Sequence, residues 1–408
     1  MKILLTSDTY ENQINGVSCS VITLRDELRK KGHDVRVLTL SSNSESKMVK
    51  TDYLIGSFSV PFYPDARQTL KFKDKIIDDI VKWHPDIIHI QTEFSIGHVS
   101  KKIAKLCNCP YINTSHTLYE DYTTYVIPSK KIGRVLARKF VKKSYRDSDA
   151  IIAPTNKIKD LLESYGIEKP IHIIPTGIDL DRFKKKLSMV ERSKIKSQLK
   201  LNNKSKILVS IGRVAKEKNL DEIIEFLPDL VEKDKNIVLL IGGDGPYKKN
   251  IEQKVKKLKM EKYVRFLGMI PPQETYKYYQ LGDIFVCAST SETQGITYIE
   301  ALACGTPLVC RYDKCLDGVI INDFNGYTYT NKKEYIKYIF KILDKKALHK
   351  KLKDNALECS INYSKEKFSD NIEKLYLDVI AKKGCENSEG KWSKLYKCYK
   401  NVRHWYDR

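Results

Sequence analysis

Two acidic residues eight positions apart, Glu292 and Glu300, stand at the expected start of a helix. The segment DIFVCASTSETQGITYIEALACGTPLVC (283–310) predicts a strand, a polar loop and a helix that begins near Gly295. Backbone N–H groups at such a helix start can bind a diphosphate, and each carboxylate can accept two hydrogen bonds from adjacent sugar hydroxyls. An ordinary helix start with two solvated acids is the alternative. The N–H groups concerned belong to Gln294, Gly295 and Ile296.

Two residues in the first half of the chain are further candidates for a ligand site. His116 ends a predicted strand in NTSHTLYEDY (113–122), so it should point toward the sheet edge where ligands bind. A lone histidine is more often structural. Gly16 lies between a predicted strand and a predicted helix, although Asn15-Gly16 taken alone is simply a turn signal.

The elements that must position these residues are short apolar strands alternating with helical patterns, which is typical of parallel sheets covered by crossover helices. The pattern runs once through the first half of the chain and restarts at Lys206. We therefore expect an α/β fold with two Rossmann-like domains facing across a cleft, where open sheets of this kind bind ligands. The expected parts are an acceptor-side domain at 1–180, a polar linker at 181–205, a second domain at 206–360, and a C-terminal helix and tail at 361–408 that pack back on the first domain.

The composition limits the class of protein. The chain has 408 residues, 73 Lys and Arg against 51 Asp and Glu, and a net charge of +22, which predicts attraction to polyanions. The excess is concentrated in 130–146, 184–206 and 381–408. Ten cysteines without C-x2-C pairs indicate reduced thiols, and no apolar run approaches the ~18 residues that span a bilayer. The apolar run at the start of the chain is too short for the core of a signal peptide. We therefore expect a cytoplasmic protein with at most peripheral membrane contact.

The basic segment 130–146 predicts a helix that lies on an anionic membrane surface, because it combines cations with an apolar stripe. A solvated helix packed on the first domain is the alternative. The tail 391–408 interleaves aromatic residues with cations and suits a lipid headgroup region or a return to the first domain. The cations expected to face the membrane are Lys131, Arg134, Arg138 and Lys142.

Two D-x-D strings, Asp147-Ser-Asp149 and Asp179-Leu-Asp181, have the pattern that some sugar-transferring enzymes use to hold a cation. We interpret both as structural, because the first precedes a strand and the second follows a turn. The chain contains neither G-x-x-x-x-G-K-[ST] nor G-x-G-x-x-G, which removes the usual signals of an ATPase or a dehydrogenase. No metal is expected.

The segment 283–310 resembles the E-x7-E signature of the retaining family 4 glycosyltransferases, which have the two-domain GT-B fold and use sugar nucleotides. SIGRVAKEKNLD (210–221) resembles the same family's phosphate-binding loop, and IGGDGP (241–246) resembles a third landmark. By this resemblance Arg213 and Lys218 would contact the donor diphosphate, Glu292 the transferred hexose, and Glu300 the ribose. Gly16 would belong to the loop that lets the donor approach the backbone, and His116 would lie near the reacting sugar.

The sequence HTLYEDY (116–122) is similar to the subgroup that glycosylates diacylglycerol. The resemblance implies transfer of a hexose to diacylglycerol at an anionic membrane surface, on the cytoplasmic face and without a metal, and glucose from UDP-glucose is the expected donor sugar. Another acceptor, such as phosphatidylinositol, a glycolipid or a cell-wall polymer, is the alternative within this chemistry. A nucleic-acid-binding protein is the alternative outside it, although the chain has no recognised binding module.

Overall fold

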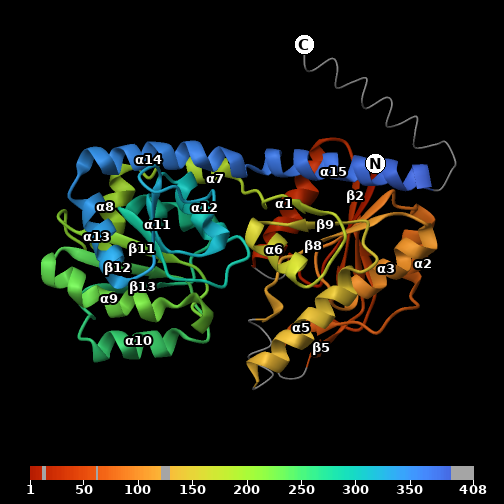
Figure 1. Cartoon of the computed structure of the whole chain (residues 1–408), viewed down its shortest axis with the longest axis horizontal. Coiled ribbons are helices and arrows are strands. Elements are labelled where there is room, and N and C mark those ends of the chain that lie inside the picture. The colour runs from red at the N-terminus through yellow and green to blue at the C-terminus, as the bar shows by residue number, and fades with distance from the viewer. Residues whose placement is uncertain (12–14, 61–62, 121–128, 387–408) are drawn as a thin grey trace, which may run out of the picture. The chain divides into compact units, whose positions relative to one another are not determined.

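The computed structural model describes residues 1–11, 15–60, 63–120 and 129–386, which form two compact units (Figure 1). The first unit consists of Met1–Gly177 together with the chain from Lys365 onward, and the second consists of Ile178–Ser364. Each unit is an α/β domain built on a largely parallel sheet.

The first unit contains an eight-stranded sheet in the order β10-β9-β8-β7-β1-β2-β4-β3, in which only β3 runs antiparallel to its neighbour. Its strands are β1 (Lys2–Thr6), β2 (Asp34–Leu40), β3 (Lys47–Val49), β4 (Asp52–Ile55), β7 (Ile87–Ile90), β8 (Tyr111–Thr114), β9 (Ala150–Ala153) and β10 (Ile171–Ile173). A separate hairpin pairs β5 (Phe58–Val60) with β6 (Tyr63–Gln68).

Helices cover both faces of this sheet, so its strands are apolar at consecutive positions. Ile3 packs with α1 and α15 on one face, whereas Leu4 packs with α2 and α3 on the other. The helix α15 presents an apolar stripe to the first face through Phe368 and Ile372. The helices are α1 (Gly16–Lys30), α2 (Lys75–Trp83), α3 (Ser95–Cys107), α5 (Lys130–Tyr145), α6 (Asn156–Ser164) and α15 (Lys365–Glu386).

The second unit contains a six-stranded parallel sheet in the order β13-β12-β11-β14-β15-β16. Apolar residues again alternate between two helix-covered faces, since Val209 and Leu208 belong to different core clusters. Its strands are β11 (Lys206–Ile211), β12 (Ile237–Gly242), β13 (Val264–Gly268), β14 (Ile284–Cys287), β15 (Leu308–Arg311) and β16 (Gly326–Tyr329). Its helices are α7 (Leu180–Lys184), α8 (Met189–Gln198), α9 (Leu220–Lys233), α10 (Lys248–Lys257), α11 (Thr275–Leu281), α12 (Ile296–Ala303), α13 (Lys332–Leu343) and α14 (Lys346–Ser360).

The range 181–205, which the sequence predicts to be a linker, is a folded part of the second unit. It holds most of α7 and all of α8, and a capping box at Ser188 begins α8. Phe183, Leu187 and Leu201 are buried in the core of that unit. These three apolar residues are widely spaced among lysines, so their burial gives little periodic signal in the sequence.

Candidate active site

Lys218 and Glu292, two of the residues predicted to bind a donor, are in direct contact. The Lys218 Nζ donates to the Glu292 Oε1 at 2.6 Å, and only 25% and 15% of these side chains are exposed. Burial opposes the charge on the lysine, but the neighbouring carboxylate prevails and raises the pKa of Lys218. The site therefore holds a charged ammonium group and a carboxylate side by side.

The sheet topology brings these two residues together across 74 positions of sequence. Lys218 ends a short 3-10 turn (Lys216–Lys218) after β11, and Glu292 lies in the loop between β14 and α12. Strands β11 and β14 are parallel neighbours, so the loops that follow them meet at one edge of the sheet. The Ser291 hydroxyl, which donates to the Glu217 carbonyl at 3.2 Å, joins the two loops.

Glycines allow a third loop to approach the same edge. Gly243, which follows β12, has φ +121°, and a Cβ there would lie 1.9 Å from the Gly212 carbonyl oxygen. Gly245 has φ +158°, and its Cβ would meet the Val214 carbonyl at 2.4 Å. Only residues without a Cβ permit this approach. The loops that contain IGR (211–213) and IGGDGP (241–246) thus pack tightly against each other at this edge of the sheet.

The first turn of α12 has a backbone that suits an anion. Gly295 precedes the helix with φ +75°, and no side chain caps this N-terminus among the described residues. A Cβ on Gly295 would lie 2.2 Å from the Tyr298 ring, so only glycine fits. Gln294 is buried and Ile296 is the first helical residue. Uncapped N–H groups at a helix start carry partial positive charge.

Arg213 lies in the loop after β11, three residues before the 3-10 turn that ends at Lys218. It forms an ion pair with Glu217, and half of its side chain is exposed. An exposed pair of this kind contributes little to stability, so the guanidinium can exchange its partner for a ligand phosphate.

Glu300 is engaged by two residues that the sequence analysis missed. Arg182 of α7 donates to its Oε1 at 3.1 Å, and the Tyr279 hydroxyl of α11 donates to its Oε2 at 2.8 Å. The Glu300 side chain is 14% exposed, and burial raises its pKa against the opposing effect of both partners. Neither partner belongs to a recognisable motif, so only the tertiary structure identifies them.

In the first unit, His116 follows β8 and lies beside Gln91, which follows β7. The His116 Nε2 and the Gln91 Oε1 are 2.7 Å apart, and burial lowers the pKa of His116 to about 4. The imidazole is therefore neutral at physiological pH. Gln91 is 1% exposed, and its Nε2 has no partner among the described residues. Gly16 is the first residue of α1, whose N-cap is Asn15.

The same edge of this sheet holds two acids that no sequence motif predicted, the buried Glu93 and the partly buried Asp8. Glu93 accepts hydrogen bonds from the hydroxyls of Tyr119 and Tyr145, and burial raises its pKa to about 7. Asp8 accepts from Thr92 at 2.6 Å and from a backbone N–H, and burial raises its pKa as well. An acid directly after a buried strand is the one sequence signal that could have indicated them.

The surface of α5 is both basic and apolar. Ile132, Val135 and Leu136 are each about half exposed, whereas Val141 and Tyr145 are buried against the first unit. The predicted apolar stripe thus divides into an outward and an inward part. The four predicted membrane-facing cations are all exposed, although Arg134 also pairs with Glu120 at 3.3 Å and Arg138 contacts a carbonyl. They are Lys131, Arg134, Arg138 and Lys142. In the portion of the chain that the structure describes, no helix is long and apolar enough to cross a bilayer, and the aromatic tail lies outside that portion.

The first D-x-D string is engaged in structural contacts. Asp149 accepts from the Tyr111 backbone at 3.0 Å and from Lys383 at 3.2 Å, while Asp147 pairs with Arg146. Asp179 forms the N-cap of α7, and Asp181 pairs with Lys184.

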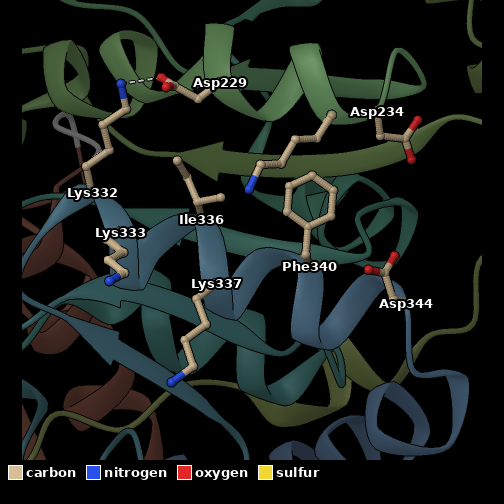
Figure 2. Close-up of a pocket in the computed structure, with 9 residues that line it drawn as sticks. Asp229, Asp234, Lys332, Lys333, Ile336, Lys337, Phe340 and Asp344 are labelled. Atoms are coloured by element: carbon tan, nitrogen blue, oxygen red, sulfur yellow. Dashed lines mark ion pairs between the residues drawn. The ribbon is translucent and has the colours of Figure 1, made fainter.

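A hollow of about 900 Å³ between α9 and α13 contains none of the predicted donor residues (Figure 2). Ile336 and Phe340 form its apolar wall, Lys332 pairs with Asp229, and the Lys233 ammonium lies over the Phe340 ring at 5.6 Å. Two of its cations, Lys332 and Lys233, therefore have partners on the protein.

Comparisons with known proteins match both halves of the chain to glycosyltransferases. Residues 14–182 match the family model "Glycosyltransferase Family 4", and residues 191–358 match "Glycosyl transferases group 1". The alpha-monoglucosyldiacylglycerol synthase of Streptococcus pneumoniae is 33% identical over 93% of this chain and 86% of its own length. The protein of the same name from Acholeplasma laidlawii is also 33% identical, over 94% of this chain and 98% of its own.

Solved structures show the fold. The Anabaena protein HepE, in complex with UDP and glucose, matches with a TM-score of 0.74 and 18% identity over 92% of this chain and 99% of its own. WaaG, a glycosyltransferase involved in lipopolysaccharide biosynthesis, matches with a TM-score of 0.68 and 16% identity over 92% and 99% of the two chains. Both alignments cover the two α/β units.

Proposed function

Because the chain belongs to the family 4 glycosyltransferases with the GT-B fold, we propose that it transfers glucose from UDP-glucose to the free hydroxyl of 1,2-diacylglycerol, with retention of configuration. The protein is a hexosyltransferase. The two relatives named as alpha-monoglucosyldiacylglycerol synthases cover nearly the whole chain, which supports this donor and acceptor.

The observation that carries the proposal is the Lys218–Glu292 contact beside the uncapped start of α12. Lys218, Arg213 and the first N–H groups of α12 place positive charge where a diphosphate would lie. Glu292 is the carboxylate available for the hexose hydroxyls, and Glu300 is the one for the ribose. The Gly16 loop and His116 contribute contacts to the donor and the reacting sugar.

The chemistry follows from these charges. The bond between the anomeric carbon and the UDP oxygen breaks, and negative charge accumulates on the leaving diphosphate. Cations held close to that charge stabilise the transition state. The acceptor hydroxyl then bonds to the anomeric carbon from the face that UDP leaves, and its proton passes to a phosphate oxygen. The Lys218 and Arg213 side chains neutralise the leaving diphosphate, as a metal ion does in metal-dependent glycosyltransferases. The proposed reaction therefore requires no metal.

We place the enzyme peripherally on the inner face of the cell membrane, with α5 toward the lipid. Half-exposed Ile132, Val135 and Leu136 beside cations support this orientation, since a basic amphipathic helix binds an anionic bilayer. The alternative acceptors, phosphatidylinositol, a glycolipid or a cell-wall polymer, would use the same donor site. Nucleic-acid binding predicts instead that DNA competes with vesicles at equal salt concentration.

The deciding experiment is transfer of radiolabelled sugar from a panel of sugar nucleotides to diacylglycerol in phosphatidylglycerol vesicles. We expect UDP-glucose to be the best donor and an α-linked monoglucosyl lipid to be the product. Transfer only to vesicles that contain phosphatidylinositol or a glycolipid would select the alternative acceptor. Absence of transfer from any sugar nucleotide, with an intact folded protein, would reject the proposal.

A further inference from the structure

The Glu300 carboxylate has exactly one protein donor on each of its two oxygens among the contacts described. Arg182 bonds Oε1 at 3.1 Å and Tyr279 bonds Oε2 at 2.8 Å. An ionised carboxylate offers about four acceptor positions, so one position on each oxygen is left for a ligand. Two neighbouring hydroxyls on a ribose ring match such a pair of acceptors in number and kind.

We propose that Arg182 and Tyr279 are positioning residues that hold the Glu300 carboxylate in the orientation that receives the ribose of the nucleotide. The inference rests on the proposed function, because that function supplies the ribose. It assigns to Arg182 and Tyr279 a role in donor recognition that acts through Glu300.

Burial explains why Glu300 needs these partners. Its side chain is 14% exposed and Tyr279 is fully buried, so the surroundings favour the neutral carboxylic acid. Burial raises the pKa of Glu300, while the Arg182 charge and the Tyr279 hydroxyl lower it. Cys304, the C-cap of α12, also interacts with Glu300, and Lys353 of α14 interacts with Cys304. Of the groups facing Glu300 directly, Arg182 is the cation.

The arrangement around Arg182 is more consistent with orienting a ligand group than with stabilising the fold. The guanidinium lies over the Phe183 ring at 4.4 Å, which fixes its plane. It uses Nη2 toward Glu300, while its buried Nε has no partner in the described part of the chain. An ion pair that served only stability would gain from a bidentate arrangement, in which two N–H groups of the guanidinium bond to the two carboxylate oxygens. Here the guanidinium is shown to contact the carboxylate through Nη2 alone.

The test is calorimetric binding of UDP and of 2′,3′-dideoxy-UDP to the full-length protein between pH 6 and pH 9. The wild-type protein should prefer UDP over the dideoxy compound by about 10-fold or more, with little change across this pH range. Arg182→Gln should reduce that preference to about 3-fold or less at pH 7, because the carboxylate loses a donor that orients it and the cation that opposes its protonation. The loss should be smaller at pH 9 than at pH 7, because a higher pH favours the ionised carboxylate.

Three further variants keep the test decisive. Tyr279→Phe removes one hydroxyl only, so it should fold and show a smaller loss in the same direction. Arg182→Lys should restore part of the preference, because it restores the charge. Arg192→Gln, which removes another arginine of this unit whose contact is the Gln280 carbonyl, should leave the preference unchanged.

An unchanged preference in both Arg182→Gln and Tyr279→Phe would overturn the inference while the proposed function stands. A wild-type protein that does not bind UDP would instead reject the proposed function. If Arg182→Gln fails to fold, the result for Tyr279→Phe decides.

Discussion

Replacing Lys218 by methionine is the sharpest perturbation of the donor site. Methionine keeps the length and apolar stem of the side chain but removes the charge that contacts Glu292 at 2.6 Å. The substitution therefore affects both the unfolding free energy and the rate of transfer. It leaves a mostly buried carboxylate without its cation, and it removes positive charge from the proposed leaving diphosphate.

The two effects have different magnitudes. Breaking a fully buried ion pair costs about 3–5 kcal/mol in unfolding free energy. The 25% and 15% exposure of Lys218 and Glu292 allows water to solvate the remaining charge, so we expect a loss of about 1–3 kcal/mol. Removing one group that stabilises transition-state charge costs about 2.7–4 kcal/mol, or ~100- to 1,000-fold in turnover.

The double variant Lys218→Met/Glu292→Gln separates these effects. Neutralising both partners removes the unpaired charge, so the unfolding free energy should return to within about 1 kcal/mol of the wild type. Turnover at saturating UDP-glucose should stay at least ~100-fold low, because neither change restores the cation. Arg213→Ala is the matched comparison, since its exposed pair predicts normal stability with a similar loss of turnover. Near-normal turnover in Lys218→Met, or recovery of turnover in the double variant, would refute the assignment of Lys218 to the donor site.

Three other predictions concern the metal, the membrane and the buried acid. Transfer should survive EDTA, and a complete loss that Mg²⁺ or Mn²⁺ restores would contradict the cationic donor site. Replacing the four α5 cations by Gln should weaken sedimentation with phosphatidylglycerol vesicles, since each gains about 1 kcal/mol near an anionic surface. The same change at four exposed lysines of the second unit should not weaken it, and equal effects would reject the α5 orientation. Glu93→Gln should flatten the dependence of unfolding free energy on pH. Because the folded pKa of about 7 exceeds the ordinary 4.5, the wild type loses stability as pH rises through this window, and a parallel profile in the variant would contradict the role of Glu93. The α5 cations are Lys131, Arg134, Arg138 and Lys142, and the control lysines are Lys249, Lys256, Lys257 and Lys259.

The features on which the donor-site prediction rests are recognisable in the sequence because they depend on the local backbone. A helix start, glycines at tight approaches and a carboxylate at fixed spacing all leave a pattern in the chain. The Lys218–Glu292 contact also follows once both residues are placed after parallel strands, since such loops gather at one edge. Whether Arg213 contacts the ligand is still a prediction, because its partner in the structure is Glu217.

The partners of Glu300 could not be predicted in this way. Arg182 lies in the stretch expected to be a linker, and Tyr279 is one of 25 tyrosines in the chain. Their selection depends on α7 and α11 packing against α12, which is a property of the tertiary structure. The pattern of a lysine-rich stretch predicts solvent exposure when its few apolar residues are far apart. The burial of Phe183 reveals α7 as part of the core.

Buried polar groups at the sheet edge of the first unit carry the remaining information about function. An unpartnered buried donor such as the Gln91 Nε2 costs about 1–3 kcal/mol, and a buried acid such as Glu93 is costly when ionised. A fold shaped by stability alone would place apolar residues there. Gln91 and Glu93 follow β7 and His116 follows the neighbouring strand β8, at the edge where open α/β sheets bind ligands, and Gln91 contacts the neutral imidazole of His116. The first unit therefore retains costly polar groups at the edge of its own sheet where a ligand would bind.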